Sequence, residues 1–410
     1  MESMLSVEEA RERVLARFQP LDIEEAPVAE ALGRILAEDA VASEASPPFA
    51  NSAMDGYALR AADTRSATSA DPARLRLAGE VAAGGVYDGE LGTGEAARIF
   101  TGAPIPPGSD AVIQQELVTV AEGYVALTAP VAVENNIRAA GSDVQPGALL
   151  ARAGTEIGPA EVALLASLGH ATARVRRRPR VAILATGDEL QPLGTPLRPG
   201  QIHDSNTPYL TTAVLRAGGV PVSLGIARDR EEDLRAKLDA ARGFDLLLTS
   251  GGVSVGDYDL VKQMLTARGA MAFWRVRLKP GKPLAFGEVD GTPTLGLPGN
   301  PVSAAVTFEL FGRPAIRAML GAASVLRPEI DVMYIGADIP RGDRRQFVRV
   351  RLDSAGGRLV ARDTGGQESH LISSLQGATA LLIAPEGAGL IRSGDTARAM
   401  LLNDAMPWGV

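Results

Sequence analysis

The spacing of apolar residues changes along the chain and predicts three regions of different structure. From Val7 to Phe18 apolar residues recur on one helix face, and Ser6 precedes them as a candidate N-cap. Residues 26–42 are predicted to be helical and then extended. Between residues 51 and 133, short apolar runs alternate with Gly, Pro and Asp, which predicts β strands joined by turns.

At Arg180 the period changes to that of an α/β domain. The continuous apolar run from Val181 to Ala185 is typical of a strand buried on both faces. Alternating helices and strands after it predict a parallel sheet with right-handed crossovers. The predicted elements are helix 207–217, strand 220–227, helix 231–241, strand 245–250, helix 258–267, short strands within 271–297 and helix 302–320. After about residue 327 the pattern is again β.

Composition narrows the classes of function. The 410 residues predict two to four domains. A formal net charge of -8 disfavours a nucleic-acid binder. The absence of cysteine excludes thiolate metal sites and disulfides, and the spacing of His170, His203 and His370 fits no common zinc motif. With no signal peptide and no long apolar run, we expect a cytoplasmic protein that does not enter a membrane.

The candidate chemistry lies in loops that follow predicted strands, where open parallel sheets bind ligands. The Gly251-Gly252 loop opens a helix and suits a phosphate, although a tight turn explains it equally well. Asn300 and Pro301 are typical of a helix start, which would place Ser303 in the first turn. That pattern is also explained by a capped helix with no ligand.

Lys279-Pro280-Gly281-Lys282-Pro283 is the sharpest local feature. Each lysine precedes a proline, which biases its backbone to an extended conformation. Two ammonium groups on such a loop favour an oxyanion site over a solvated turn. Acids gather in the neighbouring loops, which suggests Mg²⁺, although each alone is typical of a solvated loop or a helix cap. These acids are Asp188, Glu189, Asp229, Asp257 and Asp259.

Six sequence blocks in order resemble the molybdopterin molybdenumtransferase family, which includes the E domain of gephyrin. The blocks begin at Asn51 (NSAMDGYA), Thr101 (TGAPIP), Thr186 (TGDEL), Ser250 (SGGVSVG), Lys279 (KPGKP) and Pro298 (PGNPVS). Glu368 departs from the family pattern, in which this position is usually small.

The resemblance implies a multidomain α/β plus β architecture. It consists of an elongated hinge and dimerisation region (1–48 and 137–177), an inserted β domain (49–136), a central parallel α/β domain like the molybdopterin adenylyltransferases (178–326) and a C-terminal β-barrel (327–410). It also implies a homodimer that inserts molybdate into adenylylated molybdopterin with Mg²⁺ and releases AMP. Implied partners are molybdopterin adenylyltransferase and molybdoenzyme-maturation proteins.

The resemblance also assigns site residues. The acids and base expected in the reaction are Asp55, Glu189, Asp229, Asp259 and Lys279, of which Glu189 and Asp229 are expected to hold the metal. The residues expected to bind the pterin, phosphate or oxyanion are Thr101, Asp143, Gly251, Gly252, Ser254, Lys279, Lys282, Pro298, Asn300, Ser303, Arg349 and Ser369.

Two other functions remain open from the sequence. An adenylyltransferase that makes the pterin substrate would share the α/β domain, but the additional β domains and the Lys-Pro-Gly-Lys loop favour metal insertion. A receptor-anchoring scaffold like gephyrin is disfavoured, because the chain lacks an additional trimerising domain and a long linker.

Overall fold

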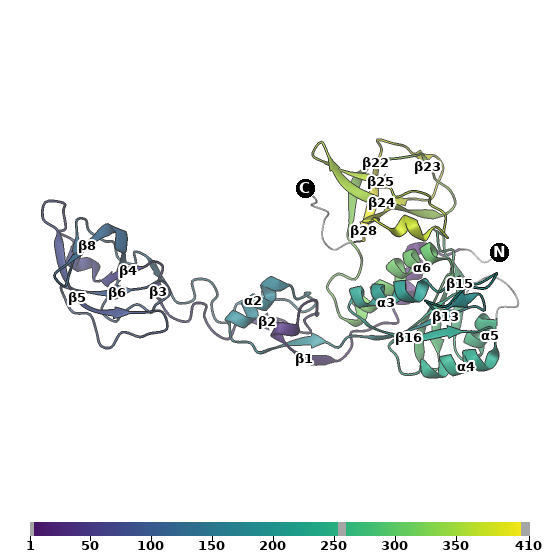
Figure 1. The fold of residues 1–410 in the computed structure, drawn as a ribbon, viewed down its shortest axis with the longest axis horizontal. Coiled ribbons are helices and arrows are strands. Elements are labelled where there is room, and N and C mark those ends of the chain that lie inside the picture. The colour runs from purple at the N-terminus through teal and green to yellow at the C-terminus, as the bar shows by residue number, and fades with distance from the viewer. Residues whose placement is uncertain (1–3, 253–259, 403–410) are drawn as a thin grey trace.

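The chain folds into an elongated molecule whose parts lie in a row. The computed structural model describes residues 4–252 and 260–402. Figure 1 shows a β domain at one end, a small hinge in the middle, and the α/β domain with the barrel stacked on it at the other end. No helix among the described residues is long and apolar enough to cross a membrane.

A six-stranded mixed sheet forms the α/β domain, in the order β16-β13-β17-β21-β20-β18. The first four strands are parallel, as predicted, whereas β20 runs antiparallel to both of its neighbours, β21 and β18. The bounds are β16 Val220–Ala227, β13 Arg180–Thr186, β17 Leu246–Ser250, β21 Thr292–Leu297, β20 Pro283–Val289 and β18 Met271–Arg275. Beside the sheet, β14 (Leu190–Gln191) pairs with β15 (Ile202–His203).

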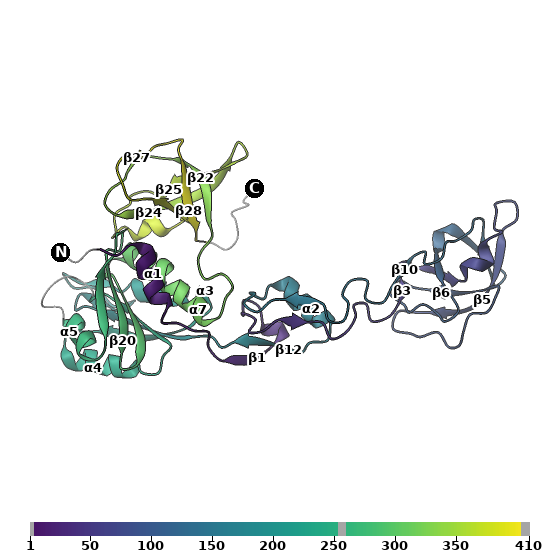
Figure 2. The same ribbon diagram turned by 180° about the vertical axis from the view of Figure 1, so that it is seen from behind.

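Helices cover both faces of this sheet (Figure 2). On one face, α4 (Glu231–Ala240) and α5 (Leu260–Ala267) pack on Ala182 and Leu184. On the other face, the core residues come from α1, α3, α6 and α7. Their bounds are α1 Val7–Leu15, α3 Asn206–Ala217, α6 Pro301–Thr307 and α7 Arg313–Met319, the last two joined by a π-helical turn, η4, at Phe308–Gly312.

The N-terminal helix is well specified by its sequence. Ser6 and Glu9 form a capping box, and Val7, Ala10 and Val14 are buried, so the predicted helix and cap are confirmed. The helix ends at Leu15, three residues earlier than predicted. It packs against α7 in the core of the α/β domain rather than in the hinge region to which its sequence position assigns it.

Short strand pairs and one helix build the hinge. Antiparallel pairs join β1 (Ile23–Pro27) to β12 (Thr172–Arg176) and β2 (Ala40–Val41) to β11 (Leu149–Ala151). The predicted helix after residue 26 is wrong, because β1 is followed only by a 3-10 turn, η1 (Val28–Glu30). The hinge also contains one helix, α2 (Pro159–Ser167).

The β domain is a six-stranded sheet in the order β7-β4-β6-β5-β9-β8, which confirms the β pattern of residues 51–133. The pair β3 (Asn51–Ser52) and β10 (Ile137–Arg138) closes its connection to the hinge. The bounds are β4 Gly56–Leu59, β5 Ala73–Val81, β6 Glu95–Ile99, β7 Ala111–Gln114, β8 Val118–Ala121 and β9 Tyr124–Leu127, with 3-10 turns η2 (Ala61–Thr64) and η3 (Gln115–Leu117).

The C-terminal β-barrel is confirmed. The order β24-β25-β22-β28-β26 closes on itself because β24 also pairs with β26. A further strand, β19 (Leu278–Lys279), comes from the α/β domain and pairs with β24. The remaining bounds are β22 Glu329–Ile335, β23 Ile339–Pro340, β24 Arg345–Ala355, β25 Arg358–Asp363, β26 Ala380–Ala384, β27 Leu390–Ile391, β28 Thr396–Leu401 and the 3-10 turn η5 Ile372–Leu375.

A buried ion pair secures the passage from the α/β domain to the barrel. Glu309 lies in the π-helical turn and Arg327 shortly precedes β22. Their side chains are 10% and 2% exposed, and Arg327 Nε donates to Glu309 Oε2 over 2.9 Å. Removing one partner of such a pair leaves a buried charge without its counter-ion.

Arg327→Met is therefore expected to lower the free energy of unfolding by about 3–5 kcal/mol. Urea denaturation followed by circular dichroism, in the transition that includes the α/β domain, measures the loss. The double variant Glu309→Leu with Arg327→Met should recover most of it, because it buries no unpaired charge. Unfolding of Arg327→Met at the wild-type urea concentration would contradict this account of the pair.

Candidate active site

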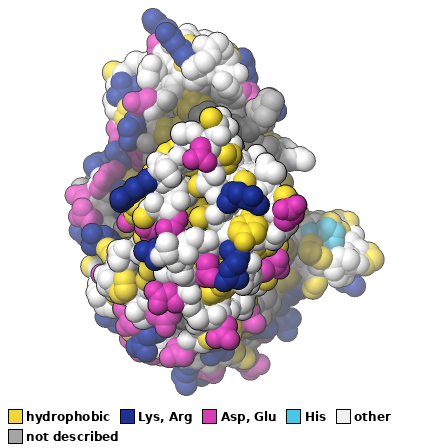
Figure 3. All heavy atoms as spheres, turned by 90° about the vertical axis from the view of Figure 1, so that its left-hand side faces the viewer, with side chains coloured by type: hydrophobic (Ala, Val, Ile, Leu, Met, Phe, Trp, Pro, Cys, Tyr) yellow, Lys and Arg dark blue, Asp and Glu magenta, His cyan; other side chains and the backbone are white. Residues whose placement is uncertain are grey.

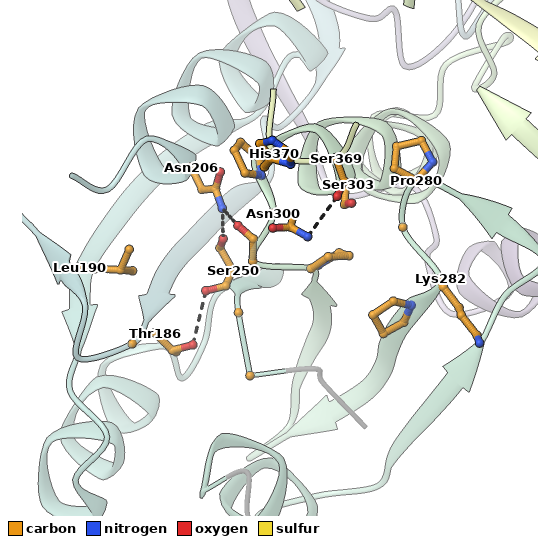
Figure 4. Close-up of a pocket in the computed structure, with 18 of the residues that line it drawn as sticks. Thr186, Leu190, Asn206, Ser250, Pro280, Lys282, Asn300, Ser303, Ser369 and His370 are labelled. Atoms are coloured by element: carbon orange, nitrogen blue, oxygen red, sulfur yellow. Dashed lines mark hydrogen bonds between the residues drawn. The ribbon is translucent and has the colours of Figure 1, made fainter. Parts of the chain in front are cut away.

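A cleft of about 1210 Å³ lies between the α/β domain and the barrel. Its floor is formed by the loops that follow β13, β17 and β21, and a barrel loop that contains Ser369 and His370 covers one side (Figure 4). The position at the carboxyl ends of parallel strands agrees with the prediction.

The loops after β13 and β16 each present an acid to the cleft. Glu189 and Asp229 both line it. The loops that carry them are in contact, because the Asp229 N–H donates to Asp188 Oδ1 over 3.2 Å. Arg228 Nη1 donates to the carbonyls of Asp188 and Leu190, at 3.0 and 2.8 Å. This guanidinium therefore fixes the backbone on both sides of Glu189.

The loop after β17 requires glycine. Gly251 and Gly252 have φ of +97° and +65°. A Cβ on Gly251 would lie 2.8 Å from Thr186 Oγ1, and one on Gly252 would lie 2.4 Å from Val261 Cγ1. Both glycines line the cleft, so the chain passes close to its neighbours and leaves the floor open. The predicted residues Ser254 and Asp259 lie outside the described residues.

Asn206 links two loops of the cleft floor through its side-chain amide. The sequence alone did not predict this role. The amide donates to Ser250 Oγ over 2.7 Å and to the Gly299 carbonyl over 2.8 Å (Figure 4). It thus connects the first residue of α3 to the ends of β17 and β21. Its position before a helix resembles an ordinary cap, which is why spacing alone does not single it out.

The two lysines of the Lys-Pro-Gly-Lys loop, Lys279 and Lys282, both line the cleft. Their side chains are exposed, and neither has an ion-pair partner among residues 4–252 and 260–402. Lys279 belongs to β19, where it pairs with Gln346 of the barrel strand β24. The barrel therefore helps to hold the loop in place.

Helix α6 starts as predicted, with Asn300 at the N-cap position, Pro301 as its first residue and Ser303 in its first turn. Asn300 makes no side-chain cap; its amide donates instead to Ser369 Oγ over 3.1 Å. The Val302 N–H donates to the Ser369 carbonyl, also over 3.1 Å. The barrel loop thus occupies a free N–H of the helix start, and Ser303, Pro298 and Ser369 line the cleft around it.

Arg349 is not among the residues that line the cleft. It is 1% exposed. Its Nε donates to Ser374 Oγ over 3.1 Å, and its Nη2 donates to the carbonyls of Gly366 and Glu368. Burial lowers the pKa of this guanidinium to about 10. In this structure Arg349 holds the barrel loop from behind instead of facing the cleft.

Three predicted residues lie far from the cleft of their own chain. Asp55 and Thr101 belong to the β domain, at the opposite end of the molecule (Figure 1). Asp143 lies in the connection from β10 back to the hinge, where its N–H donates to the Ser46 carbonyl. The structure therefore divides the predicted residues between two ends of an elongated chain.

Two hydrogen bonds from Thr101 hold the carboxylate of Asp55. Its Oδ1 accepts from both the N–H and the hydroxyl of Thr101, each over 2.8 Å. The Thr101 N–H and hydroxyl, helped by the charge of Arg98, hold the pKa of Asp55 below its usual value. The guanidinium of Arg98 lies 5.0 Å from the centre of the Tyr57 ring and 5.1 Å from that of Phe100.

No group of three or more His, Asp or Glu side chains that could hold a metal occurs among the described residues. Glu189 and Asp229 remain a pair of carboxylates at one wall. Mg²⁺ in nucleotide sites commonly takes one or two carboxylates plus phosphate oxygens and water, so this donor set fits that ion.

Comparison with known proteins gives matches over nearly the whole chain. Models of the MoeA N-terminal region (domain I and II), a probable molybdopterin binding domain and the MoeA C-terminal region (domain IV) match residues 5–169, 182–318 and 336–402. The molybdopterin molybdenumtransferase of Haemophilus influenzae is 36% identical over 96% of this chain and 97% of its own length. Molybdopterin molybdenumtransferase 2 of Mycobacterium tuberculosis is 39% identical over 95% of this chain and 98% of its own length.

The fold has matches among crystal structures as well. The molybdopterin biosynthesis MoeA protein from Pyrococcus horikoshii is 32% identical, with a TM-score of 0.83 over 97% of this chain and 100% of that one.

Thr101→Val is expected to raise the pKa of Asp55, because it removes the hydroxyl donor and leaves the N–H. As the pH is lowered, any activity that needs the ionised carboxylate would then be lost at a higher pH in the variant than in the wild type. The ¹³C chemical shift of the Asp55 carboxyl, followed by NMR against pH, measures the pKa directly. Thr119→Val, in β8 of the same domain, is the control. An unchanged Asp55 pKa in Thr101→Val would refute the assignment.

Proposed function

The chain belongs to the molybdopterin molybdenumtransferase family, and we propose that its cleft is where molybdate reacts with adenylylated molybdopterin to give molybdenum cofactor and AMP. One observation carries the proposal. A single cleft contains two lysines without an ion-pair partner among the described residues, the start of a helix, a glycine loop and several acids. This combination suits a substrate with a phosphate at one end and a small oxyanion as co-substrate.

Lys279 and Lys282, with the hydroxyls of Ser303 and Ser369, bind and orient the molybdate. A helix N-terminus contributes about 0.3–1 kcal/mol to an exposed anion. Micromolar binding requires about 8 kcal/mol. Charge-assisted hydrogen bonds from the lysines must therefore supply most of the affinity. Arg349 supports this pocket through the barrel loop that carries Ser369.

Gly251, Gly252, Pro298 and Asn300 form the surface for the pterin and its phosphates. Glu189 and Asp229, which line the same cleft, would hold Mg²⁺. When bound there, the ion supplies positive charge at the pyrophosphate. Glu189 orients the phosphate end of the substrate, and Arg228 keeps that carboxylate in place through the backbone carbonyls on either side.

We infer further that the active unit is a homodimer in which Asp55, Thr101 and Asp143 serve the cleft of the partner. A twofold partner can bring the β-domain end of one chain to the cleft of the other, which the chain's own β domain does not reach (Figure 1). The hinge offers apolar surface for such an interface, since the register partners Val41 and Leu149 are 47% and 45% exposed. Side chains of both charges and apolar side chains mix at the β-domain end (Figure 3).

A reaction of this kind needs an enzyme that adenylylates molybdopterin to supply its substrate. We therefore propose such an adenylyltransferase, and the maturation proteins that receive the product, as partners.

The wild-type protein is expected to release AMP from adenylylated molybdopterin in the presence of Mg²⁺, and to do so only when molybdate is added. Lys279→Ala should raise the molybdate concentration for half-maximal rate by about 10- to 100-fold, since one charged hydrogen bond contributes about 1.5–3 kcal/mol. Lys279→Arg keeps the charge, so its molybdate concentration for half-maximal rate should lie between those of the wild type and Lys279→Ala. Chromatography of AMP measures the rate. Release that is independent of molybdate would exclude the proposed reaction.

Mixing two inactive variants tests the shared cleft. Asp55→Ala and Glu189→Gln homodimers should each be inactive. Heterodimers would contain one intact site of the two and should regain up to about half of the wild-type activity. Differently tagged chains allow the heterodimer to be purified before assay. A verified heterodimer without activity would show that both residues serve the same chain's site or that Asp55 only supports the fold.

A further inference from the structure

Arg344 is a cleft residue to which neither the sequence motifs nor the resemblance assigns a role. It immediately precedes β24 and lines the cleft together with Lys279 and Ser369. Its side chain is 33% exposed, and its ion-pair contact is with its own neighbour Asp343, from Nε to Oδ1 over 3.6 Å. Asp343 is 78% exposed. Exposed pairs of this kind are weak, so the guanidinium is free to turn towards a ligand.

The start of β24 brings Arg344 to the cleft that Lys279 also lines. In the parallel pair of β19 and β24, Lys279 is the partner of Gln346, and paired residues project to the same face. Arg344 lies immediately before the first residue of β24, two positions from Gln346, and lines the same cleft as Lys279. Two cations, one from each domain, thus line one cleft.

The neighbouring arginines of this strand are committed elsewhere. Arg345 pairs with Glu8 and, from its Nε over 3.3 Å, with Glu386. Arg349 is buried, and its guanidinium donates hydrogen bonds to Ser374 and to two backbone carbonyls of the barrel loop. Of the three, Arg344 is the one whose guanidinium borders the cleft.

We propose that Arg344 supplies a guanidinium that contacts a tetrahedral oxyanion in this cleft, a role that neither the motifs nor the resemblance assigns to it. This inference rests on the proposed function, since it assumes that the cleft binds molybdate or the phosphate of the nucleotide. A planar guanidinium beside an ammonium offers paired N–H donors that a lysine lacks, which suits an anion with several oxygens.

Glu368 adds a negative charge to the cleft and so makes an additional cation more important for anion binding. It lines the cleft at a position where the family usually has a small residue. With Glu189 and Asp229, it gives the described cleft lining three acids, opposite Lys279, Lys282 and Arg344. Without Arg344 the acids would outnumber the basic side chains, and binding of a dianion would be opposed by the remaining charge.

Isothermal titration calorimetry of the full-length protein, with molybdate and AMP as separate ligands, tests the inference. Arg344→Gln should weaken binding of at least one of them by about tenfold, the effect of losing one charge-assisted bond. Arg344→Lys keeps the charge and should lose less affinity than Arg344→Gln. The matched control is Arg351→Gln, on the same strand, whose side chain is 60% exposed and contacts Asp353 over 3.4 Å outside the cleft. The control should bind both ligands as wild type, and all three variants should keep the wild-type melting temperature.

The outcomes are distinguishable. Weaker molybdate binding places Arg344 in the molybdate subsite, and weaker AMP binding alone places it at the nucleotide phosphate; either supports the proposal. Wild-type affinity of Arg344→Gln for both ligands overturns it. Titration of Lys279→Ala alongside distinguishes failure of the Arg344 proposal from failure of the proposed function. If Lys279→Ala binds molybdate weakly while Arg344→Gln binds normally, only the role of Arg344 fails. If both bind normally, the cleft is not the oxyanion site and the proposed function fails with it.

Discussion

The pairing of β19 with β24 is the interaction on which the rest of the site depends. Two residues of the α/β domain, Leu278 and Lys279, form an additional edge strand of the barrel sheet. This pairing fixes the barrel over the carboxyl ends of β13, β17 and β21. The contacts of Ser369 with Asn300 and Val302 then close the same junction from the other side. Without this junction, the lysine loop and the barrel loop would not face one cleft.

The sequence predicted the floor of the cleft because the relevant information is local. A run of buried strand residues, such as Val181 to Ala185, marks a strand, and the loop after it must then lie at the carboxyl edge of the sheet. Glu189, Asp229 and Gly251 could be placed in this way. The helix predicted after residue 26 failed because β1 is stabilised by β12, nearly 150 residues later in the chain, and not by its own spacing.

The barrel side of the cleft could not be predicted from spacing for the same reason. Arg344 and Arg349 stand five residues apart in one arginine-rich stretch, and their sequence does not distinguish the exposed side chain from the buried one. Their difference comes from closure of the barrel, which leaves Arg349 only 1% exposed, whereas Arg344 precedes the strand and lines the cleft. Asn206 escaped notice because its two acceptors, Ser250 and Gly299, come from separate strand ends. A family resemblance, in contrast, carries residue roles over such distances, as it does for Asp55.

The central claim is that an oxyanion binds where the α/β domain and the barrel meet. Crystals soaked in molybdate and measured with X-rays near the molybdenum absorption edge would locate the ion by its anomalous signal. The account predicts one strong peak per chain within hydrogen-bonding distance of Lys279 and Ser369. A strong peak elsewhere on the chain, with none in this cleft at saturating molybdate, would contradict it.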